Sequence, residues 1–223
     1  MNVLDATISL IAPHYCVGCT SQGSLLCNDC YVNLLPAVRR CYNCLTANTT
    51  FATCQACRQQ SPLRAVYAAT RYQAAAKQLL WSLKFDRGRQ AAAIIAKSLA
   101  ATLPHVPDDV IVMPTATARS RVRLRGYDQA ALIARQYAKY TQLPYKPLLI
   151  RTGSQEQIGA GRDQRRDQLR NAYSVRHPHE VAGKTIILVD DVVTTGATLE
   201  TAAHALTQAG ARAVHGLAFA QVS

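Results

Sequence analysis

The sequence lacks a long hydrophobic run. No apolar stretch approaches the ~20 residues that a membrane-spanning helix needs, so we expect no membrane span. Residues 1–13 have no basic n-region, and no small-residue pattern precedes Cys16, so we expect no signal or lipoprotein peptide. Residues 3–11 instead fit a short amphipathic helix. We therefore expect a cytoplasmic protein.

Aromatic and acidic residues are also scarce. Aromatic residues make up 6% of the chain, with ten Tyr and one Trp, which leaves few side chains for stacking on nucleic-acid bases. Thirteen acidic residues stand against 25 Lys and Arg, which gives a formal charge of +12. A basic chain suits anionic substrates and is compatible with nucleic acid, but total charge does not identify a site.

Cysteine is absent after residue 57, and the eight cysteines before that point form four Cys-x-x-Cys pairs. Two such pairs complete the tetrahedral Cys₄ site that structural zinc prefers, so we expect two structural Zn²⁺ sites. A disulfide framework is an alternative that the missing export signal disfavours, and iron–sulfur ligation is another. The candidate ligands are Cys16, Cys19, Cys27, Cys30, Cys41, Cys44, Cys54 and Cys57.

The four pairs can combine sequentially or interleaved. Sequential pairing closes loops of seven and nine residues, and interleaved pairing closes longer ones. Loop-closure entropy favours the sequential arrangement weakly, and on that ground we favour a double zinc ribbon. So few large apolar side chains occur here that metal binding is expected to supply the folding free energy. Each Zn²⁺ with four thiolates carries −2, so two centres lower the formal charge from +12 to about +8.

A second pattern lies at residues 186–198. Four apolar residues, 186–189, predict a buried parallel strand, and residues 199–206 have helical spacing. The intervening turn therefore lies where open α/β sheets bind ligands. Its small residues let successive backbone N–H groups face a phosphate, while Asp190 and Asp191 suit a diol or Mg²⁺ held through water. The pattern predicts a ribose 5-phosphate site; the alternative is an ordinary strand, turn and helix.

This run resembles the phosphoribosyl pyrophosphate (PRPP) motif of type I phosphoribosyltransferases. The resemblance implies that the acidic pair takes the ribose hydroxyls, that the turn takes the 5-phosphate, and that Mg²⁺ accompanies PRPP. The implied PRPP-binding residues are Asp190, Asp191, Val192, Val193, Thr194, Thr195, Gly196, Ala197 and Thr198.

A basic segment follows a strand-like stretch at residues 110–114. If its backbone is extended, four alternating arginines lie on one side, and guanidinium groups match the oxygens of a pyrophosphate. A solvated basic loop is the alternative. Asp128 is expected to cap a helix that starts at Gln129. The four arginines are Arg119, Arg121, Arg123 and Arg125. The candidate catalytic residues are Asp190, Asp191, Arg121 and Arg125, and Thr115 and Arg119 are further candidates for PRPP binding.

The whole arrangement resembles the ComF/GntX family, in which Cys-x-x-Cys ribbons precede a type I phosphoribosyltransferase domain. Pro114, Arg121 and residues 125–129 match its strand-ending Pro and its Arg-Gly-Phe-Asn-Gln segment. Residues 157–165 match a later Gln- and Arg-containing stretch, and residues 84–85 match a Lys-Phe/Tyr segment. The sequence differs from the family pattern at three positions, with Ala116 in place of Pro, Asp128 in place of Asn and Ala160 in place of Leu. These differences bear on the pyrophosphate side of the site and on the choice of acceptor.

The order of elements predicts the architecture. We expect residues 1–62 to hold an N-terminal helix and the double ribbon, and residues 63–223 to form the phosphoribosyltransferase domain. Alternating strands and helices predict an α/β fold with a mostly parallel sheet and helices on both faces. The expected strands are 65–72, 110–114, 145–150, 184–190 and 213–219. The expected helices are 73–83, 89–103, 128–140, 160–170 and 198–209. The helix at 160–170 carries four arginines that fit either a hood over the site or a solvated face.

Two functions follow from these patterns. The first is an enzyme that moves a 5-phosphoribosyl group between pyrophosphate and an acceptor such as a nucleobase, a glycosyltransferase reaction of nucleotide salvage, linked by resemblance to DNA uptake or utilisation. The alternative is a non-catalytic competence protein that handles single-stranded DNA with its ribbons and basic loops, uses PRPP as a ligand or sensor, and meets DNA-uptake proteins. The acceptor contacts lack a motif, so the sequence identifies neither the base nor whether catalysis occurs.

Overall fold

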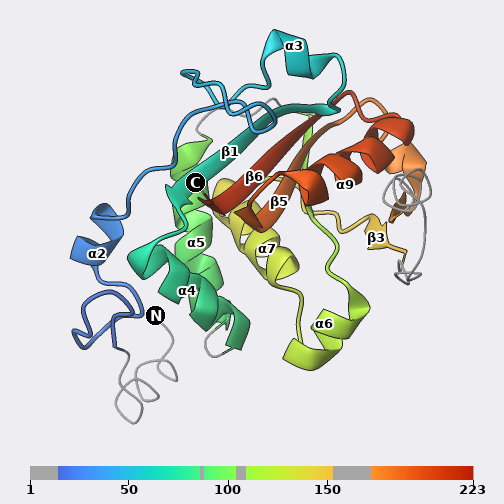
Figure 1. Ribbon diagram of the computed structural model, residues 1–223. Coiled ribbons are helices and arrows are strands. Elements are labelled where there is room, and N and C mark those ends of the chain that lie inside the picture. Colours follow the sequence, from blue (N-terminus) through green and yellow to red (C-terminus); the bar gives the residue numbers. More distant parts are fainter. Residues whose placement is uncertain (1–14, 86–87, 104–108, 153–171, 223) are drawn as a thin grey trace, which may run out of the picture.

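The computed structural model describes residues 15–85, 88–103, 109–152 and 172–222 (Figure 1). Its main sheet has four strands in the order β1-β6-β5-β2, and every neighbouring pair is parallel. The prediction of a mostly parallel α/β sheet is confirmed. The predicted helices at 3–11 and 160–170 lie outside the described residues. The strands are β1 (Leu63–Arg71), β2 (Val110–Pro114), β5 (Thr185–Val193) and β6 (Ala213–Gln221).

Helices cover both faces of this sheet (Figure 1). Successive side chains of β5 point to opposite faces, so Ile187 joins the core under α4, α5 and α7, and Leu188 joins the core under α9. This explains the continuous apolar run before the acidic pair, since both faces are buried. The helices are α4 (Ala74–Phe85), α5 (Gly88–Thr102), α7 (Gln129–Thr141) and α9 (Ala197–Gln208).

The strand predicted at 145–150 does not join the main sheet as a full strand. Tyr145 forms a single parallel bridge with Val112. The chain then enters β3 (Leu149–Arg151), which pairs antiparallel with β4 (Tyr173–Val175) in a separate two-stranded sheet. Pro144 and Pro147 flank the bridge, and a proline has no N–H to donate to a ladder, which keeps the pairing short.

The basic segment is not extended, which corrects the sequence prediction. It forms the short helix α6 (Arg119–Arg125), which ends at Gly126 in the left-handed conformation, with φ of 78°. Residues two apart on a helix lie on roughly opposite faces, so the four alternating arginines divide into two pairs instead of sharing one side. Arg and Leu are good helix formers, and the run contains no proline, so local propensity favours this helix.

The two cysteine-rich segments pack along the free edge of β1. Residues 35–37 and 51–53 exchange backbone hydrogen bonds with β1, including Arg71 N to Leu35 O at 2.9 Å and Thr53 N to Arg64 O at 2.9 Å. They therefore cover an edge that would otherwise expose unpaired N–H and C=O groups. Short helices α2 (Asn28–Val32) and α3 (Gln55–Arg58) belong to these segments. The proposed domain boundary at residue 62 precedes β1 and stays a prediction. Within the described residues, no helix is both long and apolar enough to span a membrane.

Candidate functional site

The acidic pair lies inside β5, which extends to Val193 instead of ending at residue 190. Asp191 Oδ2 lies 3.0 Å from Lys84 Nζ of α4. The Lys84 side chain is 25% exposed and that of Asp191 is 19% exposed. The backbone N–H of Asp191 donates to Asp190 Oδ1 at 2.8 Å. The strand thus holds the Asp191 carboxylate against a lysine, while Asp190 lines the hollow formed with the following loop.

Asp190 has an unusual electrostatic environment. Burial raises its pKa well above the ordinary value of a carboxyl group, and the neighbouring charge of Asp191 raises it further. A hydrogen bond with the Thr115 side chain opposes this rise. Thr115 is buried at the end of β2, where its N–H donates to Val189 O at 2.9 Å. A cation or a diol bound here would stabilise the ionised form of Asp190.

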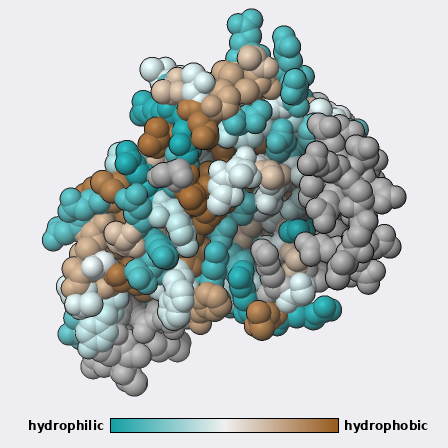
Figure 2. Space-filling view, in the orientation of Figure 1, coloured by the Kyte–Doolittle hydropathy of each residue, from teal (hydrophilic) through white to brown (hydrophobic). Residues whose placement is uncertain are grey.

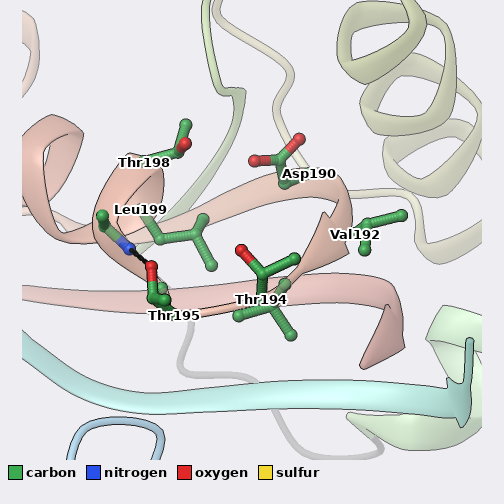
Figure 3. Close-up of a pocket in the computed structure, with 9 residues that line it drawn as sticks. Asp190, Val192, Thr194, Thr195, Thr198 and Leu199 are labelled. Atoms are coloured by element: carbon green, nitrogen blue, oxygen red, sulfur yellow. Dashed lines mark hydrogen bonds between the residues drawn. The ribbon is translucent and has the colours of Figure 1, made fainter. Parts of the chain in front are cut away.

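The turn after β5, residues 194–198, is the predicted phosphate loop. Gly196 adopts φ of 79° at the N-cap of α9 and has no side chain to cap the helix. Beyond Ala197, the N–H groups of the first helical turn have no acceptor within the helix and can face a ligand, and the helix dipole adds positive potential. Figure 3 shows Asp190, Thr194 and Thr198 around the turn, with the Thr195 hydroxyl accepting from Ala197 N at 3.4 Å. A hollow of about 40 Å³ is formed by this loop and the end of β5.

A larger cleft of about 210 Å³ adjoins the acidic pair. It is lined by Lys84, Arg125 and Arg151 on the cationic side and by both aspartates. Within the described part of the chain, Arg125 Nε is buried without a hydrogen-bond partner. Gln129 Nε2, in the same cleft, is buried without a partner as well. Buried polar atoms without partners are costly, so a ligand that accepts hydrogen bonds would stabilise this site. The other lining residues are Thr115, Ala116, Thr117, Gln129, Ala130, Val192 and Thr198.

The predicted site residues thus meet only in part. Asp190, Asp191, Thr115 and Arg125 line one cleft. Arg119 and Arg121 lie on α6, and their side chains are outside the described part of the chain. Val193 is buried, so its side chain belongs to the core.

Asp128 does not add a free charge to the pyrophosphate side. Its carboxylate accepts from Ala131 N at 3.1 Å, which caps α7 as the sequence predicted. It also accepts from Thr117 N at 3.1 Å and from the Thr117 hydroxyl at 2.9 Å. The carboxylate of Asp128 accepts from these three donors with two oxygens. An asparagine in its place would have only one acceptor oxygen, because its other polar atom is an NH₂ donor.

Sequence reasoning missed several residues of the cleft. Lys84 carried a family resemblance but was not assigned to the site, and its pairing with Asp191 spans more than a hundred residues. Arg151 lies on β3 and has no motif around it. Gln129 was matched to a family segment and to the start of a helix but not to the site, yet it is buried in the cleft wall. The matched family segments were the only sequence signal for Lys84 and Gln129, and tertiary proximity places all three residues in the cleft.

The eight cysteines form two separate groups, which confirms sequential pairing. In each group the four Sγ atoms lie within 4.8 Å of one another. Cys19 Sγ lies 3.6 Å from Cys27 Sγ, and Cys44 Sγ lies 3.5 Å from Cys54 Sγ. One Zn²⁺ with Zn–S bonds of about 2.3 Å holds its ligands about 3.8 Å apart, so the sets fit a single tetrahedral ion. All eight thiols are free of disulfide bonds.

Hydrogen bonds lower the pKa of two cysteines in each group, Cys16 and Cys19 in the first and Cys41 and Cys44 in the second. The hydroxyl of Ser21 lowers the pKa of Cys19, and the hydroxyl of Thr46 lowers the pKa of Cys44 to about 6. In the first group Cys27 N donates to Cys16 Sγ at 3.3 Å. Thiolates are the form that binds metal, so both groups could hold zinc as structural centres.

Comparisons with known proteins agree with this geometry. Residues 130–221 match the family model "Phosphoribosyl transferase domain". The chain is 27% identical over 188 residues to the DNA utilization protein YhgH of Escherichia coli strain K12, a match that covers 78% of this chain and 80% of the relative. It is 32% identical over 91 residues to Competence protein F of Haemophilus influenzae, with 40% of each chain covered.

Two solved structures are similar at lower coverage. Glutamine PRPP amidotransferase from B. subtilis aligns with a TM-score of 0.44 and 23% identity, covering 60% of this chain and 29% of that chain. A structure described as the allosteric regulatory enzyme of purine biosynthesis aligns with a TM-score of 0.43 and 24% identity, covering 58% of this chain and 25% of that chain. Residues 130–221 thus match a phosphoribosyl transferase domain, and the chain, with its two four-cysteine groups, is similar to proteins named for DNA utilization and competence.

Proposed function

We propose that this protein binds PRPP or ribose 5-phosphate and transfers the 5-phosphoribosyl group between pyrophosphate and an acceptor such as a nucleobase. The observation that carries this proposal is the N-terminus of α9, which has glycine at its N-cap and follows the two carboxylates of β5 across a short turn. The N–H groups and the dipole at a helix start suit a phosphate monoester, and adjacent carboxylates suit the neutral hydroxyl end of a ribose. The loop and the acidic pair therefore match the two ends of one ligand.

The residues divide the work by charge. The phosphate loop holds the 5-phosphate through its N–H groups and threonine hydroxyls, and the acidic pair accepts from the ribose hydroxyls. Lys84, Arg125 and Arg151, which line the same cleft, stabilise the negative charge of pyrophosphate. The hard oxygen donors of Asp190 and Asp191 also fit Mg²⁺, which when bound would neutralise part of the pyrophosphate charge. In such a reaction the protein mainly positions the reactants and stabilises charge.

The test is calorimetric titration with ribose 5-phosphate and with PRPP, with and without Mg²⁺. We expect ribose 5-phosphate alone to bind and PRPP to bind more tightly when Mg²⁺ is present. The double variant Asp190→Asn with Asp191→Asn should lose more than about tenfold in PRPP affinity, since each lost hydrogen bond to a charged group costs roughly 1.5–3 kcal/mol.

The matched control is Asp109→Asn. Asp109 is also a carboxylate in an ion pair, 2.7 Å from Arg212, but it lies before β2 and away from the cleft. We expect its PRPP affinity to equal that of the unaltered protein. Unchanged affinity in the folded double variant would contradict the assignment of the acidic pair. A subsequent screen of nucleobases with PRPP and Mg²⁺ would test the transfer itself by release of pyrophosphate.

A second function is the handling of single-stranded DNA, with PRPP as a ligand or sensor. The names of the relatives support it, since one is a DNA utilization protein and another a competence protein. Three arginines on the second cysteine segment, Arg39, Arg40 and Arg58, support it as well. Salt-dependent binding of an oligonucleotide without any PRPP binding would favour this function over the transferase.

A further inference from the structure

The second zinc ribbon, residues 37–60, touches the phosphate loop through one aromatic ring. Tyr42 is 4% exposed and packs against Gly196. A Cβ placed on Gly196 would lie 2.5 Å from Cδ2 and 2.9 Å from Cε2 of the tyrosine ring, far closer than real contacts allow. Two constraints therefore meet at this glycine, because its φ of 79° also disfavours a side chain.

The cysteine knuckle determines where this ring lies. Tyr42 stands between the metal ligands Cys41 and Cys44, so its backbone position follows from the geometry of the metal centre. Its hydroxyl forms a short hydrogen bond with Ser61 Oγ, and that oxygen also accepts from Leu63 N at 3.0 Å at the start of β1. The ring is held at both ends.

The phosphate loop has room to move on the side that Tyr42 occupies. A cavity of about 410 Å³ is lined jointly by Tyr42 and its neighbours in the ribbon and by Thr194 and Thr195 of the loop. Val193 and Leu199 anchor the two ends of the loop in the core, whereas Thr194, Thr195 and Thr198 are exposed. Loss of the ring would leave Gly196 without its packing partner and the loop free to shift.

The first zinc ribbon, residues 15–34, has the same ligand pattern but a different neighbour. The residue equivalent to Tyr42 is Val17, which packs against the core of the helices on the other face of the sheet. The adjacent Gly18 lies against Cys30 and Ala75 of α4. None of the described contacts of this ribbon reaches the phosphate loop.

We propose that Tyr42 is a positioning residue, which the second zinc ribbon holds against Gly196 so that the phosphate loop is ordered for the phosphate of its ligand. This inference rests on the proposed function, in which the loop binds the 5-phosphate. The metal centre of the second ribbon then sets phosphate affinity, and that of the first ribbon does not. The specific role belongs to the ring, because the hydroxyl bonds to Ser61 outside the loop.

The test compares two cysteines in equivalent positions. Cys19 and Cys44 are both exposed, and each is the second cysteine of its first knuckle. Cys44→Ser should weaken ribose 5-phosphate binding about fivefold or more, and Cys19→Ser should change it less than about twofold, with RT ln 5 near 1 kcal/mol. Zinc content by elemental analysis should fall by about one ion per chain in both variants.

A second set of variants tests the ring itself. Tyr42→Ala should weaken ribose 5-phosphate binding as Cys44→Ser does, Tyr42→Phe should restore nearly full affinity, and Val17→Ala in the first ribbon should leave it unchanged. Rescue by Phe distinguishes ring packing from a general loss of stability, because Phe keeps the ring contact and removes only the hydroxyl. Equal affinities for Tyr42→Ala and Tyr42→Phe would overturn the role of the ring.

Hydrogen exchange separates this inference from the proposed function. We expect amides of residues 193–200 to exchange faster in Cys44→Ser and Tyr42→Ala than in Cys19→Ser and Val17→Ala. If the unaltered protein binds no sugar phosphate but exchange follows this pattern, the proposed function fails and the ordering of the loop by the ribbon stands. Equal exchange and equal affinity in the Cys19 and Cys44 variants would overturn the inference while the proposed function survives.

Discussion

The two predicted zinc ribbons have the same arrangement of cysteines and different surroundings. Each offers one buried, one exposed and two half-buried sulfurs, with cross-knuckle Sγ distances of 3.6 Å and 3.5 Å. The first packs Leu25 and Leu26 against α4 and α5, and the second packs Tyr42 and Phe51 against the core on the α9 side. Figure 1 shows them at opposite ends of β1. Two ribbons with the same cysteine motif therefore need not have the same role in the protein. The role of each ribbon depends on the part of the molecule that it contacts.

Charge distinguishes the ribbons as well. The first ribbon contains Asp29 and no Lys or Arg, so with a Zn²⁺–thiolate centre it is negative. The second contains Arg39, Arg40 and Arg58 and no acidic residue. Figure 2 shows hydrophilic side chains projecting around α3 of the second ribbon, at the top of the view. If either ribbon meets a polyanion, these charges favour the second.

The largest effect is expected from removing both metal ions. We expect two Zn²⁺ per chain, and a strong chelator should unfold both ribbons, since structural zinc in small peptides contributes about 10–16 kcal/mol. Elemental analysis and circular dichroism before and after chelation measure this. A zinc content near zero, or iron with acid-labile sulfide, would contradict the assignment and remove the basis of the comparison.

A smaller effect is expected from truncating the apolar anchor of each ribbon. Leu25 and Phe51 are 5% and 7% exposed. Leu25→Ala should lower the free energy of unfolding by about 2–5 kcal/mol, and Phe51→Ala by about 3–5 kcal/mol, measured by urea titration. Although both variants lose stability, ribose 5-phosphate binding in the folded protein should weaken only in Phe51→Ala. Equal weakening in both would mean that the ribbons do not differ in their link to the site.

The pH dependence of stability tests a residue that neither ribbon contacts. Because the pKa of Asp190 is raised in the folded state, that state retains a proton longer than the unfolded state does, and stability falls as pH rises between the ordinary carboxyl value and the raised one. Asp190→Asn should remove this fall. An increase of about 1 kcal/mol at pH 8 would raise Tm by roughly 2–4 °C. The gain in Tm from Asp190→Asn should be the same when this change is combined with Cys19→Ser as when it is combined with Cys44→Ser. A Tm of Asp190→Asn at pH 8 that does not exceed that of the unaltered protein would refute the raised pKa of Asp190.

The smallest effect concerns single-stranded DNA. We expect weak, sequence-tolerant binding that fades as salt rises. Arg39→Gln with Arg58→Gln on the second ribbon should weaken it a few-fold and lower the salt slope by about 0.7 for each lost phosphate contact. Lys139→Gln, an exposed basic residue on α7, is the control. Fluorescence anisotropy at several salt concentrations measures this, and binding that ignores ionic strength would count against a role for the second ribbon.

Much of the architecture could be predicted because it depends on local pattern. The apolar run before Asp190 gave a strand buried on both faces, and Asp128 gave the cap of α7. The errors have local causes too. The alternating arginines of residues 119–125 looked extended, but the intrinsic helix propensity of Arg and Leu prevailed. Prolines near residue 145 reduced a predicted strand to one bridge.

By itself the sequence determined the cysteine pairs, the turn between β5 and α9 and the alternation of strands and helices, because each depends on residues close together in the chain. Only the tertiary structure decided that Lys84 pairs with Asp191 and that Tyr42 packs on Gly196. These contacts join residues more than a hundred positions apart, and no periodicity or spacing encodes such a distance. They form because packing the helices and ribbons on one sheet brings distant segments together, at the edge where the strands end.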